Sequence, residues 1–563
     1  MPSAPGSPLR IGIMCNGLRL PAWQAKAIQH LLDLTPEVEI ALLIVPSGDG
    51  RRSGRLQALL RDPRHLLWNL YNKGYIERRS RASRGVDLSV TLGAVPTVSC
   101  ATEPVGRYAE RFAPEDLDTI REAGLDLIIR FAFGIIKGEI LEAARYGVWS
   151  FHHGDERAYR GQPPGFWEIV EGERTMGAIL QRITERLDGG TVLHRGTFRV
   201  TAHSYKRTRD DAFFGSADFV TTAVKRLIGG DDSVVTGEPS HTDARVRRSP
   251  GNWTMTRFLT GQALRFLATQ WRGLTRAAIW TVGFADSPIH AFLDGSTPPI
   301  HWAAEQGKGR YLADPFPDPS GLTGVVLVED YRHETHRGVI SAVELEGDAK
   351  AREVLDTGVH ASYPYLIEDD GVIYCIPETY QANQLRLYRA VEFPDRWDLE
   401  STFLDGVAAL DPTIVHHEGR WWLFCTVEGS DANTKLHVFH APRLAGPWAP
   451  HSLNPVKTNI SSSRPGGTPF VHEGTLFRPA QDGSASYGGG VTINRVDLLT
   501  PDDFRETEVA RIGPPAKGRY RDGIHTLSAQ GGRTIVDGRR DTFVFASFMR
   551  ELRARLSRVA RRG

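Results

Sequence analysis

The sequence predicts two domains of different class: an α/β domain with a mainly parallel sheet, followed by an all-β five-bladed propeller. Two observations support this arrangement. Before about residue 250, strand-like apolar runs alternate with helical patterns, which is typical of proteins with a parallel sheet. After residue 296 the helical pattern disappears, and short β runs closed by Gly, Pro, Asp or Asn turns recur about every 50 residues.

The first half opens with the apolar run LRIGIM (9–14), followed by a helical pattern over Trp23–Leu34 and by VEIALLIV (38–45). Further along, LDLIIRFAF (125–133) precedes another helical pattern over Gly138–Arg145. Ligands of such sheets bind at the carboxyl ends of the strands. We therefore expect residues 1–250 to form one α/β domain with its functional site at that edge.

An Arg-rich insertion at about residues 51–84 interrupts this pattern, with nine Arg and few acidic residues. Two interpretations stay open. The first is a solvated helical excursion, which is the usual behaviour of a charge run. The second is a surface for a phosphorylated or nucleotide-linked substrate.

Residues 251–295 are predicted to form a helical connector between the domains. Within them, residues 253–285 have the pattern of an amphipathic helix followed by a β-like run. The Leu/Phe/Trp stripe of this helix favours packing between domains, with membrane binding as the alternative.

The predicted propeller covers residues 296–547, and a basic tail follows at 548–563. Each repeat has the pattern strand, turn, strand, as in IEDDGVIYCIP, HHEGRWWLFCT and VHEGTLFRPAQ. Five such units fit a five-bladed propeller, whose blades typically have four strands. The units open at Asp314-Pro315, Tyr363-Pro364, Asp411-Pro412, Gly467-Thr468-Pro469 and His525-Thr526.

Composition excludes several classes of protein. Lys plus Arg (68) nearly balance Asp plus Glu (67), so a nucleic-acid partner is disfavoured. The four cysteines are far apart and form no CxxC pair, which argues against a zinc site or a disulfide scaffold. The start of the chain lacks a signal-peptide pattern, and no run approaches the roughly 18 apolar residues of a spanning helix. We expect a cytoplasmic protein without an integral membrane segment.

The most informative segment is residues 147–190, in which an ordered series of motif residues resembles the folate-dependent formyltransferase family. Its fold is Rossmann-like, and its members transfer a formyl group from 10-formyl-tetrahydrofolate to an amine. The resemblance covers roughly residues 9–230 and is weak in the Arg-rich insertion. The matching residues are His152, Tyr159-Arg160-Gly161, Pro164, Trp167, Gly172-Glu173, Gly177 and Leu187-Asp188-x-Gly190.

The resemblance implies that His152 and Asp188 are catalytic. Formyl transfer needs a group that takes a proton from the amine and a donor for the oxyanion. A histidine can take that proton, and a carboxylate can orient it. His153 is the adjacent alternative, but consecutive strand residues face opposite ways, so only one of the two faces the site.

The sequence departs from the family at Ser150, where the family has an Asn that donates to the oxyanion. A hydroxyl also donates one hydrogen bond, although from a different position. Three outcomes stay open: formyl transfer, a repurposed domain in which His152 is only structural, and another acyl-type reaction.

The resemblance also implies a pocket for 10-formyl-tetrahydrofolate, built by the loop around Phe131–Ile136 and the segment leading to Asp188. Core packing is an equal alternative for the apolar residues of this loop. No His, Cys or carboxylate cluster has metal-ligand spacing, so no metal is expected. The residues assigned to the cofactor are Phe133, Gly134, Ile135 and Leu187.

Polar residues near the repeat openings predict a substrate-binding propeller mouth. Three roles stay open for them: blade turns, glycan binding beside Trp421, Trp422 and Tyr487, or glycoside hydrolysis or glycosyl transfer by paired carboxylates. The pattern ADPF, SYPYLIEDDG, IPET and RPAQD also resembles the N-terminal domain of plant glucosamine inositolphosphorylceramide transferases. The residues assigned to the mouth are Asp314, Glu378, Asp411, Arg478, Asp482 and His525, with Glu428 as a further candidate.

Together these patterns predict a formyltransferase that acts on an amino sugar or related glycan precursor, with a carbohydrate-recognising propeller. The substrate is a small-molecule amine or sugar, with a nucleotide-linked form included. The alternatives are a glycan-processing enzyme with its site in the propeller, and a non-catalytic interaction protein that uses both folds as binding surfaces.

Overall fold

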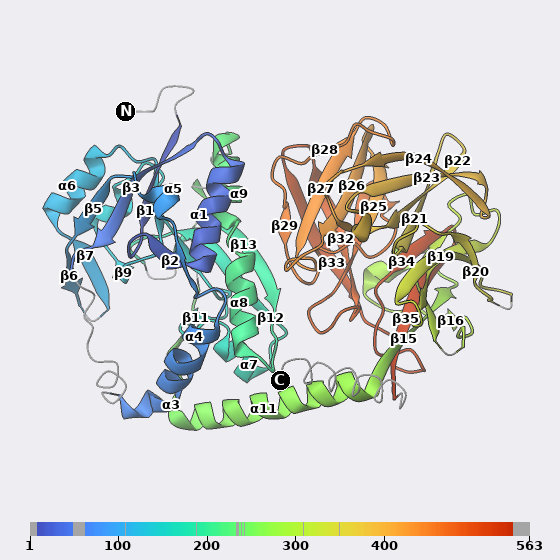
Figure 1. The fold of residues 1–563 in the computed structure, drawn as a ribbon, viewed down its shortest axis with the longest axis horizontal. Helices are drawn as coiled ribbons and strands as arrows, with labels where there is room; N and C mark the ends of the chain where they lie inside the picture. The colour runs from blue at the N-terminus through green and yellow to red at the C-terminus, as the bar shows by residue number, and fades with distance from the viewer. Residues whose placement is uncertain are drawn as a thin grey trace. The chain divides into compact units, whose positions relative to one another are not determined.

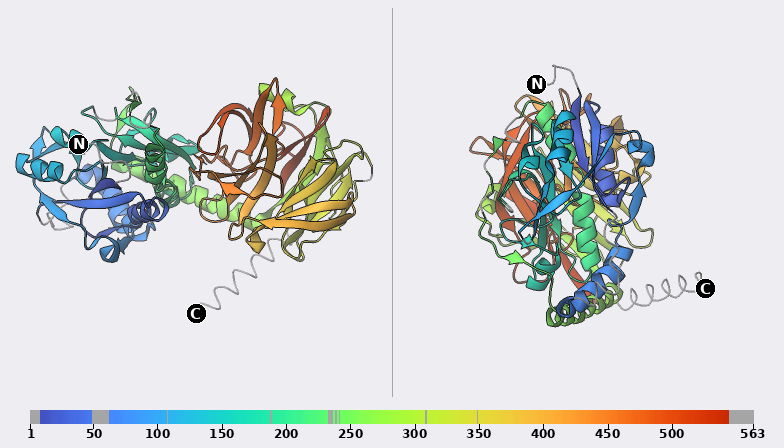
Figure 2. Two further views of the ribbon diagram at one scale, coloured as in Figure 1. Left: turned by 90° about the horizontal axis from the view of Figure 1, so that it is seen from above. Right: turned by 90° about the vertical axis from the view of Figure 1, so that its left-hand side faces the viewer.

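The computed structural model describes residues 8–48, 62–106, 108–186, 189–231, 236–237, 239–240, 242–307, 309–347 and 349–543. The chain divides into two compact units, Met1–Phe266 and Leu267–Gly563 (Figures 1 and 2). Part of the Arg-rich insertion, Leu187, Asp188 and the basic tail at 548–563 lie outside the described residues.

The first unit is built on a seven-stranded sheet of order β13-β12-β10-β8-β1-β3-β5. The pairs on the β5 side of β10 are parallel, whereas β12 and β13 join as antiparallel strands. The predicted apolar runs 9–14, 38–45 and 125–133 correspond to the buried strands β1, β3 and β8. The strands are β1 (Leu9–Met14), β3 (Val38–Pro46), β5 (Thr97–Cys100), β8 (Leu127–Arg130), β10 (Val148–His152), β12 (Thr175–Arg182) and β13 (Thr191–Arg199).

Helices cover both faces of this sheet, because alternate strand residues point to opposite sides. Ile13 and Leu127 pack in one apolar core with helices α1 and α9, while Met14 and Ile128 pack in another with α6. The α/β fold with a mainly parallel sheet is therefore confirmed. The longer helices of the unit are α1 (Ala22–Leu34), α6 (Pro114–Glu122), α7 (Phe166–Glu171), α8 (Tyr205–Gly215) and α9 (Phe219–Ile228).

Short elements complete the first unit, and the described part of the Arg-rich insertion is helical. Trp68 anchors it by packing against Phe166 and Tyr205. The helical turns are η1 (Pro63–His65), α3 (Leu66–Asn69), η2 (Leu70–Ile76), α4 (Glu77–Arg79), α5 (Ser89–Leu92) and η3 (Glu139–Glu142). The short strands are β2 (Arg19–Pro21), β4 (Gly85–Asp87), β6 (Thr102–Val105), β7 (Ala109–Phe112), β9 (Ile135–Ile136), β11 (Arg160–Gly161) and β14 (Val246–Arg247).

The segment predicted as a connector is helical only in its first part. Helix α11 (Asn252–Thr275) contains the boundary between the two units and is followed directly by β15 (Arg276–Ala285). Strand β15 pairs along its whole length with β35 (Arg533–Phe543), near the other end of the described chain. The all-β unit therefore includes residues before 296, because β15 finds its hydrogen-bonding partner about 250 residues later.

The second unit contains five antiparallel sheets within the described residues. The first strands of successive sheets contact one another, β17 with β21 and β21 with β25, so the unit is propeller-like. Figure 1 shows β21 and β25. One sheet joins β15 and β16 (His301–Trp302) to β34 (Leu527–Gln530) and β35.

The other four sheets follow one another along the chain, and two short helical turns, η4 (Ile289–Asp294) and η5 (Tyr380–Ala382), lie in this unit. Their strands are β17 (Arg310–Pro317), β18 (Val325–Arg332), β19 (Arg337–Glu344) and β20 (Arg352–Leu355); β21 (Ser362–Asp369), β22 (Val372–Glu378), β23 (Leu385–Glu392) and β24 (Arg396–Phe403); β25 (Ala409–His417), β26 (Arg420–Val427), β27 (Lys435–Ala441), β28 (Ala449–Pro450) and β29 (Lys457–Thr458); β30 (Phe470–His472), β31 (Thr475–Gln481), β32 (Val491–Leu499) and β33 (Phe504–Ile512).

Candidate functional site

The first unit holds a cavity of about 670 Å³ next to the carboxyl ends of β8 and β10. This is the edge of a parallel sheet where ligands bind. The cavity brings together three of the residues predicted from sequence with others that the sequence did not indicate. Ile135, Ser150 and His152 line it, and so do Arg130 and Gln181.

His152 is half-buried, and its imidazole is held by the chain that follows it. Its Nε2 lies 3.1 Å from the carbonyl oxygen of Tyr159. Because a carbonyl only accepts, Nε2 donates in this bond, and Nδ1 keeps the lone pair. His152 is therefore oriented as a base with Nδ1 as its accepting nitrogen.

His153 lies on the other side of strand β10, as the alternation of side chains along a strand requires. Its ring stacks on Phe213 at 3.7 Å between centroids, and its Nε2 lies 3.1 Å from the Ser216 hydroxyl. Burial lowers the pKa of His153 to about 3, so this ring is neutral at physiological pH. Only His152 of this pair lines the cavity.

Ser150 is buried and accepts two hydrogen bonds from one guanidinium group. Arg130 Nε and Nη2 lie 3.2 and 3.0 Å from its Oγ. Arg130 also donates to the carbonyl oxygens of Phe133 and Gly134, and burial lowers its pKa from the usual value. The Ser150 O–H itself donates at 3.5 Å to the carbonyl oxygen of Phe151. Since the Ser150 oxygen receives two N–H groups from a cation, this long bond leaves a hydroxyl that is a stronger donor for a ligand oxygen.

Gln181 faces Ser150 across the β10–β12 pair. Gln181 is 7% exposed, and its Oε1 atom has no hydrogen-bond partner among the described residues. A buried carboxamide oxygen without a partner is costly, so a ligand N–H or O–H is the expected partner. The cavity wall therefore offers an acceptor next to the Ser150 donor.

Of the residues assigned to the folate pocket, only Ile135 lines the cavity. Phe133 has a left-handed backbone (φ 66°), and its ring packs against Phe112 at 4.8 Å. Gly134 shapes the loop through its backbone, because its N–H donates to Glu110 and its carbonyl accepts from Arg130. Leu187 lies outside the described residues, as does the catalytic candidate Asp188.

A second cavity of about 810 Å³ adjoins the first. The two share Ile183, Thr184 and Glu185 as lining residues. The volume of the first cavity alone is in the range that small-molecule sites have.

In the second unit, backbone geometry repeated in three sheets aims side chains inward. Asp314, Tyr363 and Asp411 have φ of 51°, 46° and 50°, and each precedes a proline. Each also lies where the register between the first two strands of its sheet shifts. Such left-handed residues at bulges are strained, and they redirect the side chain at functional positions.

Buried polar side chains of the second unit form a cluster with two halves. The first half joins Asp314, His525 and Asp537. The Nε2 atom of His525 lies 3.4 Å from Asp314, and its Nδ1 atom contacts Asp537 directly. The ring of Trp280 stacks on this imidazole at 4.2 Å. Burial disfavours the charge on His525, but Asp537 and Asp314 together raise its pKa.

The other half joins Asp411, Arg464, Glu378 and Gln481. Arg464 Nε lies 2.5 Å from one oxygen of Asp411, and Gln481 donates to the same oxygen at 2.6 Å. Glu378 accepts from the backbone N–H of Asp411 at 2.8 Å. Tyr487 contacts both halves, with its ring 5.4 Å from Arg464 and 5.6 Å from His525. We name the two halves together the axial cluster.

The carboxyl groups of the axial cluster differ in their surroundings. Burial raises the pKa of Asp314 to about 6, and burial with Asp411 nearby raises that of Glu378 well above its usual value. Asp411 is instead paired with the Arg464 guanidinium, and this pair raises the pKa of Arg464 despite its burial. Carboxyl groups with divergent environments are characteristic of functional sites.

Two of the predicted mouth residues lie outside the axial cluster. Arg478 is fully buried and bonds Glu506 Oε1 at 2.6 Å and the Ser462 carbonyl, so it holds the protein together. Asp482 pairs with Arg511 at 3.2 Å. Trp421 and Trp422 pack against His416 and His440, and Glu428 bonds Ala408 through its backbone.

The sequence missed Arg464, Asp537 and Gln481, which complete the axial cluster. Each of two residues carries a weak local signal. Asp537 is a charged residue that ends the run TIVD of β35, and Arg464 directly precedes a Pro-Gly-Gly sequence. Neither signal says which distant residue it meets.

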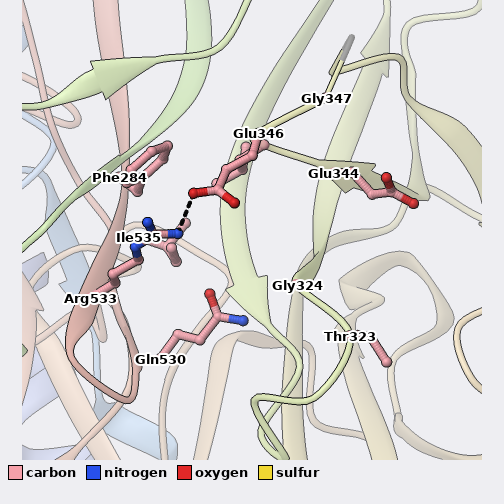
Figure 3. Close-up of a pocket in the computed structure, with 10 residues that line it drawn as sticks. Phe284, Thr323, Gly324, Glu344, Glu346, Gly347, Gln530, Arg533 and Ile535 are labelled. Atoms are coloured by element: carbon pink, nitrogen blue, oxygen red, sulfur yellow. Dashed lines mark ion pairs between the residues drawn. The ribbon is translucent and has the colours of Figure 1, made fainter.

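A smaller cleft of about 310 Å³ in the second unit is lined by an ion pair. Arg533 lies 2.6 Å from Glu346 across it and over the ring of Phe284 (Figure 3). None of the residues predicted for substrate binding lines this cleft.

One group could hold a metal ion. Ligand atoms of Asp314, His525 and Asp537 lie within 4.8 Å of one another in the described part of the chain. The imidazole already bridges the two carboxylates, which is the arrangement of an ion-paired histidine. The expectation of no metal stays a prediction.

With the geometry in place, comparison shows two classes of relative, and both are transferases by name. Residues 308–528 match the family model described as Glucosamine inositolphosphorylceramide transferase 1, N-terminal. The rice (Oryza sativa subsp. japonica) protein named Glucosamine inositolphosphorylceramide transferase 1 is 33% identical over 264 residues, which cover 43% of this chain and 35% of that protein.

The second class is the formyltransferases. Methionyl-tRNA formyltransferase of Phenylobacterium zucineum is 35% identical over 109 residues, which cover 19% of this chain and 35% of that protein. The chain thus spans about a third of the length of the curated relatives it matches. Among solved structures, an exo-β-1,3-galactanase from Clostridium thermocellum is 12% identical with a TM-score of 0.29, covering 39% of this chain and 58% of that one.

The two resemblances that the sequence indicated are therefore present in one chain: a formyltransferase-like α/β unit and a segment of the glucosamine inositolphosphorylceramide transferase type. No helix in the described part of the chain is long and apolar enough to cross a membrane.

Proposed function

We propose that the protein transfers a formyl group from 10-formyl-tetrahydrofolate to the amine of an amino sugar or related glycan precursor. The observation that carries this proposal is the cavity at the end of β10, where the base His152, the donor Ser150 and the acceptor Gln181 line one wall. The second unit, with its five sheets as five blades, recognises the carbohydrate.

In this reaction the amine nitrogen attacks the formyl carbon, and the carbonyl oxygen becomes an oxyanion. His152 Nδ1 takes a proton from the attacking amine, and the Nε2–H bond to Tyr159 holds the ring in place. The Ser150 O–H, polarised by Arg130, donates to the oxyanion in place of the family's Asn. The attack forms the new C–N bond. Collapse of the intermediate then breaks the bond between the formyl carbon and N10 of the folate, which takes the proton held by His152 and leaves as tetrahydrofolate.

Gln181 gives this site a preference for primary amines. A primary amine has a second N–H that Gln181 Oε1 can accept while the first proton goes to His152. An alcohol has a single O–H, whose proton would go to His152. The Gln181 oxygen Oε1 would then stay buried without a hydrogen-bond partner.

The amino sugar is supported by the second unit. Relatives that match this unit carry glucosamine in their name. The axial cluster supplies carboxylates that accept hydrogen bonds from sugar hydroxyl or ammonium groups, and Tyr487 is 45% exposed beside it.

The direct test is incubation of the full chain with 10-formyl-tetrahydrofolate and a panel of free and nucleotide-linked amino sugars. Mass spectrometry of the sugars should show the increment of one formyl group. N-acetylated forms of the same sugars are the matched controls, because they have no free amine. A panel without formylated product would contradict the proposal.

A second candidate function is glycan processing in the second unit. The observation that favours it is the contrast between Asp314, with its raised pKa, and Asp411, which is paired with Arg464. An acid and an ionised carboxylate are the pair that glycoside chemistry uses. If Asp411→Asn abolished the only detectable reaction while His152→Ala had no effect, the second unit would be the enzyme.

The Ser150 departure leads to a prediction. Ser150→Ala should lower the rate of formyl transfer by about 100-fold or more, which is the typical loss of one oxyanion donor. Ser150→Asn should retain activity, because its Oδ1 can accept from Arg130 while its Nδ2 donates to the oxyanion. Initial rates with saturating 10-formyl-tetrahydrofolate test both variants. An active Ser150→Ala combined with a dead Ser150→Asn would exclude a donor role for this position.

The axial cluster leads to a prediction on pH. Asp314 has a raised pKa of about 6, so its carboxyl group becomes negative as the pH rises through that value. Glucosamine, as a cation, should therefore bind more tightly at about pH 7 than at about pH 5. Isothermal titration calorimetry should show that Asp314→Asn removes most of this difference, whereas Glu344→Gln at an exposed site should not. An unchanged pH dependence in Asp314→Asn would exclude Asp314 as the titrating group.

A further inference from the structure

Helix α11 carries an apolar face that lies in solvent. The four side chains of this face, which we name the α11 stripe, are 74%, 62%, 62% and 63% exposed; they are Trp253, Leu264, Leu267 and Trp271. At 100° per residue these positions fall within about 60° of one another around the helix. Exposed leucine and tryptophan side chains aligned on one face, with tryptophan at both ends, are unusual for a protein surface in water.

In the first half of α11 the opposite face is used for packing. Met255 and Phe258 are buried, and Phe258 packs against Phe166 and Tyr205 of the first unit. Gln262 accepts a hydrogen bond from Tyr71 on the same side. These contacts lie about 140° to 200° around the helix from Trp253, so they turn the first half of the stripe outward. In the second half the opposite side is exposed as well, because Phe266 is 48% exposed.

The charges of α11 all have one sign. The helix contains Arg257, Arg265 and Arg272 and no Asp or Glu. The three arginines lie on one flank of the stripe, about 40° to 120° from Trp253. Their long side chains can extend past the apolar face to an anionic surface.

These features together define the chemistry of the partner. Tryptophan at the ends, leucine between them and arginine on the flank are the composition of a helix that lies in the plane of a bilayer interface. A flank of only arginines is complementary to anionic lipid headgroups. The helix is not apolar enough to cross the bilayer.

We infer that α11 docks the protein on an anionic membrane surface, with the stripe in the interface and its arginines at the headgroups. This inference does not depend on the proposed formyl transfer. The occupant of the stripe is the anionic lipid surface.

Sedimentation of the full chain with vesicles tests this inference. Vesicles of phosphatidylcholine and phosphatidylglycerol in equal parts should bind the protein at least about tenfold more than vesicles of phosphatidylcholine alone, and added salt should weaken the binding. Replacing Arg257, Arg265 and Arg272 with Gln should remove the preference for the anionic lipid.

The stripe is tested by Leu264→Gln, Leu267→Gln and Trp271→Gln together, which should lower binding to the anionic vesicles about tenfold or more. The matched control is Leu322→Gln with Val471→Gln, two exposed apolar side chains of the second unit, which should not change binding. Circular dichroism confirms that each variant is folded, and the basic tail is intact in all of them.

Three results would overturn the inference. One is equal binding to neutral and anionic vesicles, and another is no binding to either. The third is a stripe variant that binds vesicles normally but changes the sedimentation coefficient of the free protein, which would make the stripe an interface between copies of the chain.

Discussion

Replacing His152 with alanine is expected to lower the rate of formyl transfer by about 100- to 10,000-fold, the usual contribution of a general base. The side chain is half-buried and holds one hydrogen bond, to the Tyr159 carbonyl. Its loss should therefore cost little stability, and binding of tetrahydrofolate, followed by fluorescence, should stay nearly unchanged. The loss should appear in turnover under saturating substrate.

His153 is the matched control for this experiment, because it directly follows β10 and its side chain faces away from the cavity. His153→Phe keeps the ring that stacks on Phe213 and removes only the contact with Ser216. The rate of this variant should stay close to wild type, with a loss of stability of about 1 kcal/mol for one hydrogen bond. A His152→Ala enzyme with more than half of the wild-type turnover would exclude His152 as the base.

The difference between the two histidines could be predicted from the sequence, because alternation along a strand is a local property. The same holds for the positions of Ser150 and His152, which share a face two residues apart on β10. What local pattern could not give is the partner of Ser150. Arg130 ends an apolar strand 20 residues earlier, and only the parallel pairing of β8 with β10 brings its guanidinium to that hydroxyl.

In the axial cluster, too, the local features could be predicted from the sequence and the distant partners could not. The Asp-Pro steps at 314 and 411 mark the inward bulges, since each repeat needs the same turn in its first strand. Their partners lie 223 and 53 residues away, at Asp537 and Arg464. The pairing of β15 with β35, which completes one sheet, is equally non-local, so the sequence could not fix the start of the second unit.

Arg478 was predicted to bind substrate because polarity alone does not distinguish a mouth residue from a buried ion pair. In the structure its guanidinium is bound by Glu506 and by the Ser462 carbonyl, and Glu506 also accepts from Lys457 at 2.6 Å. Burial would raise the pKa of Glu506, but Arg478 and Lys457 together lower it. All of its donors therefore point into the protein rather than toward a ligand.

Arg478→Met should consequently destabilise the second unit by about 3 to 5 kcal/mol, because it breaks a buried pair and leaves Glu506 with only Lys457. Urea unfolding of the full chain, followed by circular dichroism, should show an early transition for this variant. Arg495→Met is the matched control: it lies on the neighbouring strand β32, is 47% exposed and pairs with Asp497, so its loss should cost less than about 1 kcal/mol. An Arg478→Met variant that is stable but binds glucosamine more weakly would contradict this structural role and indicate that Arg478 binds the substrate.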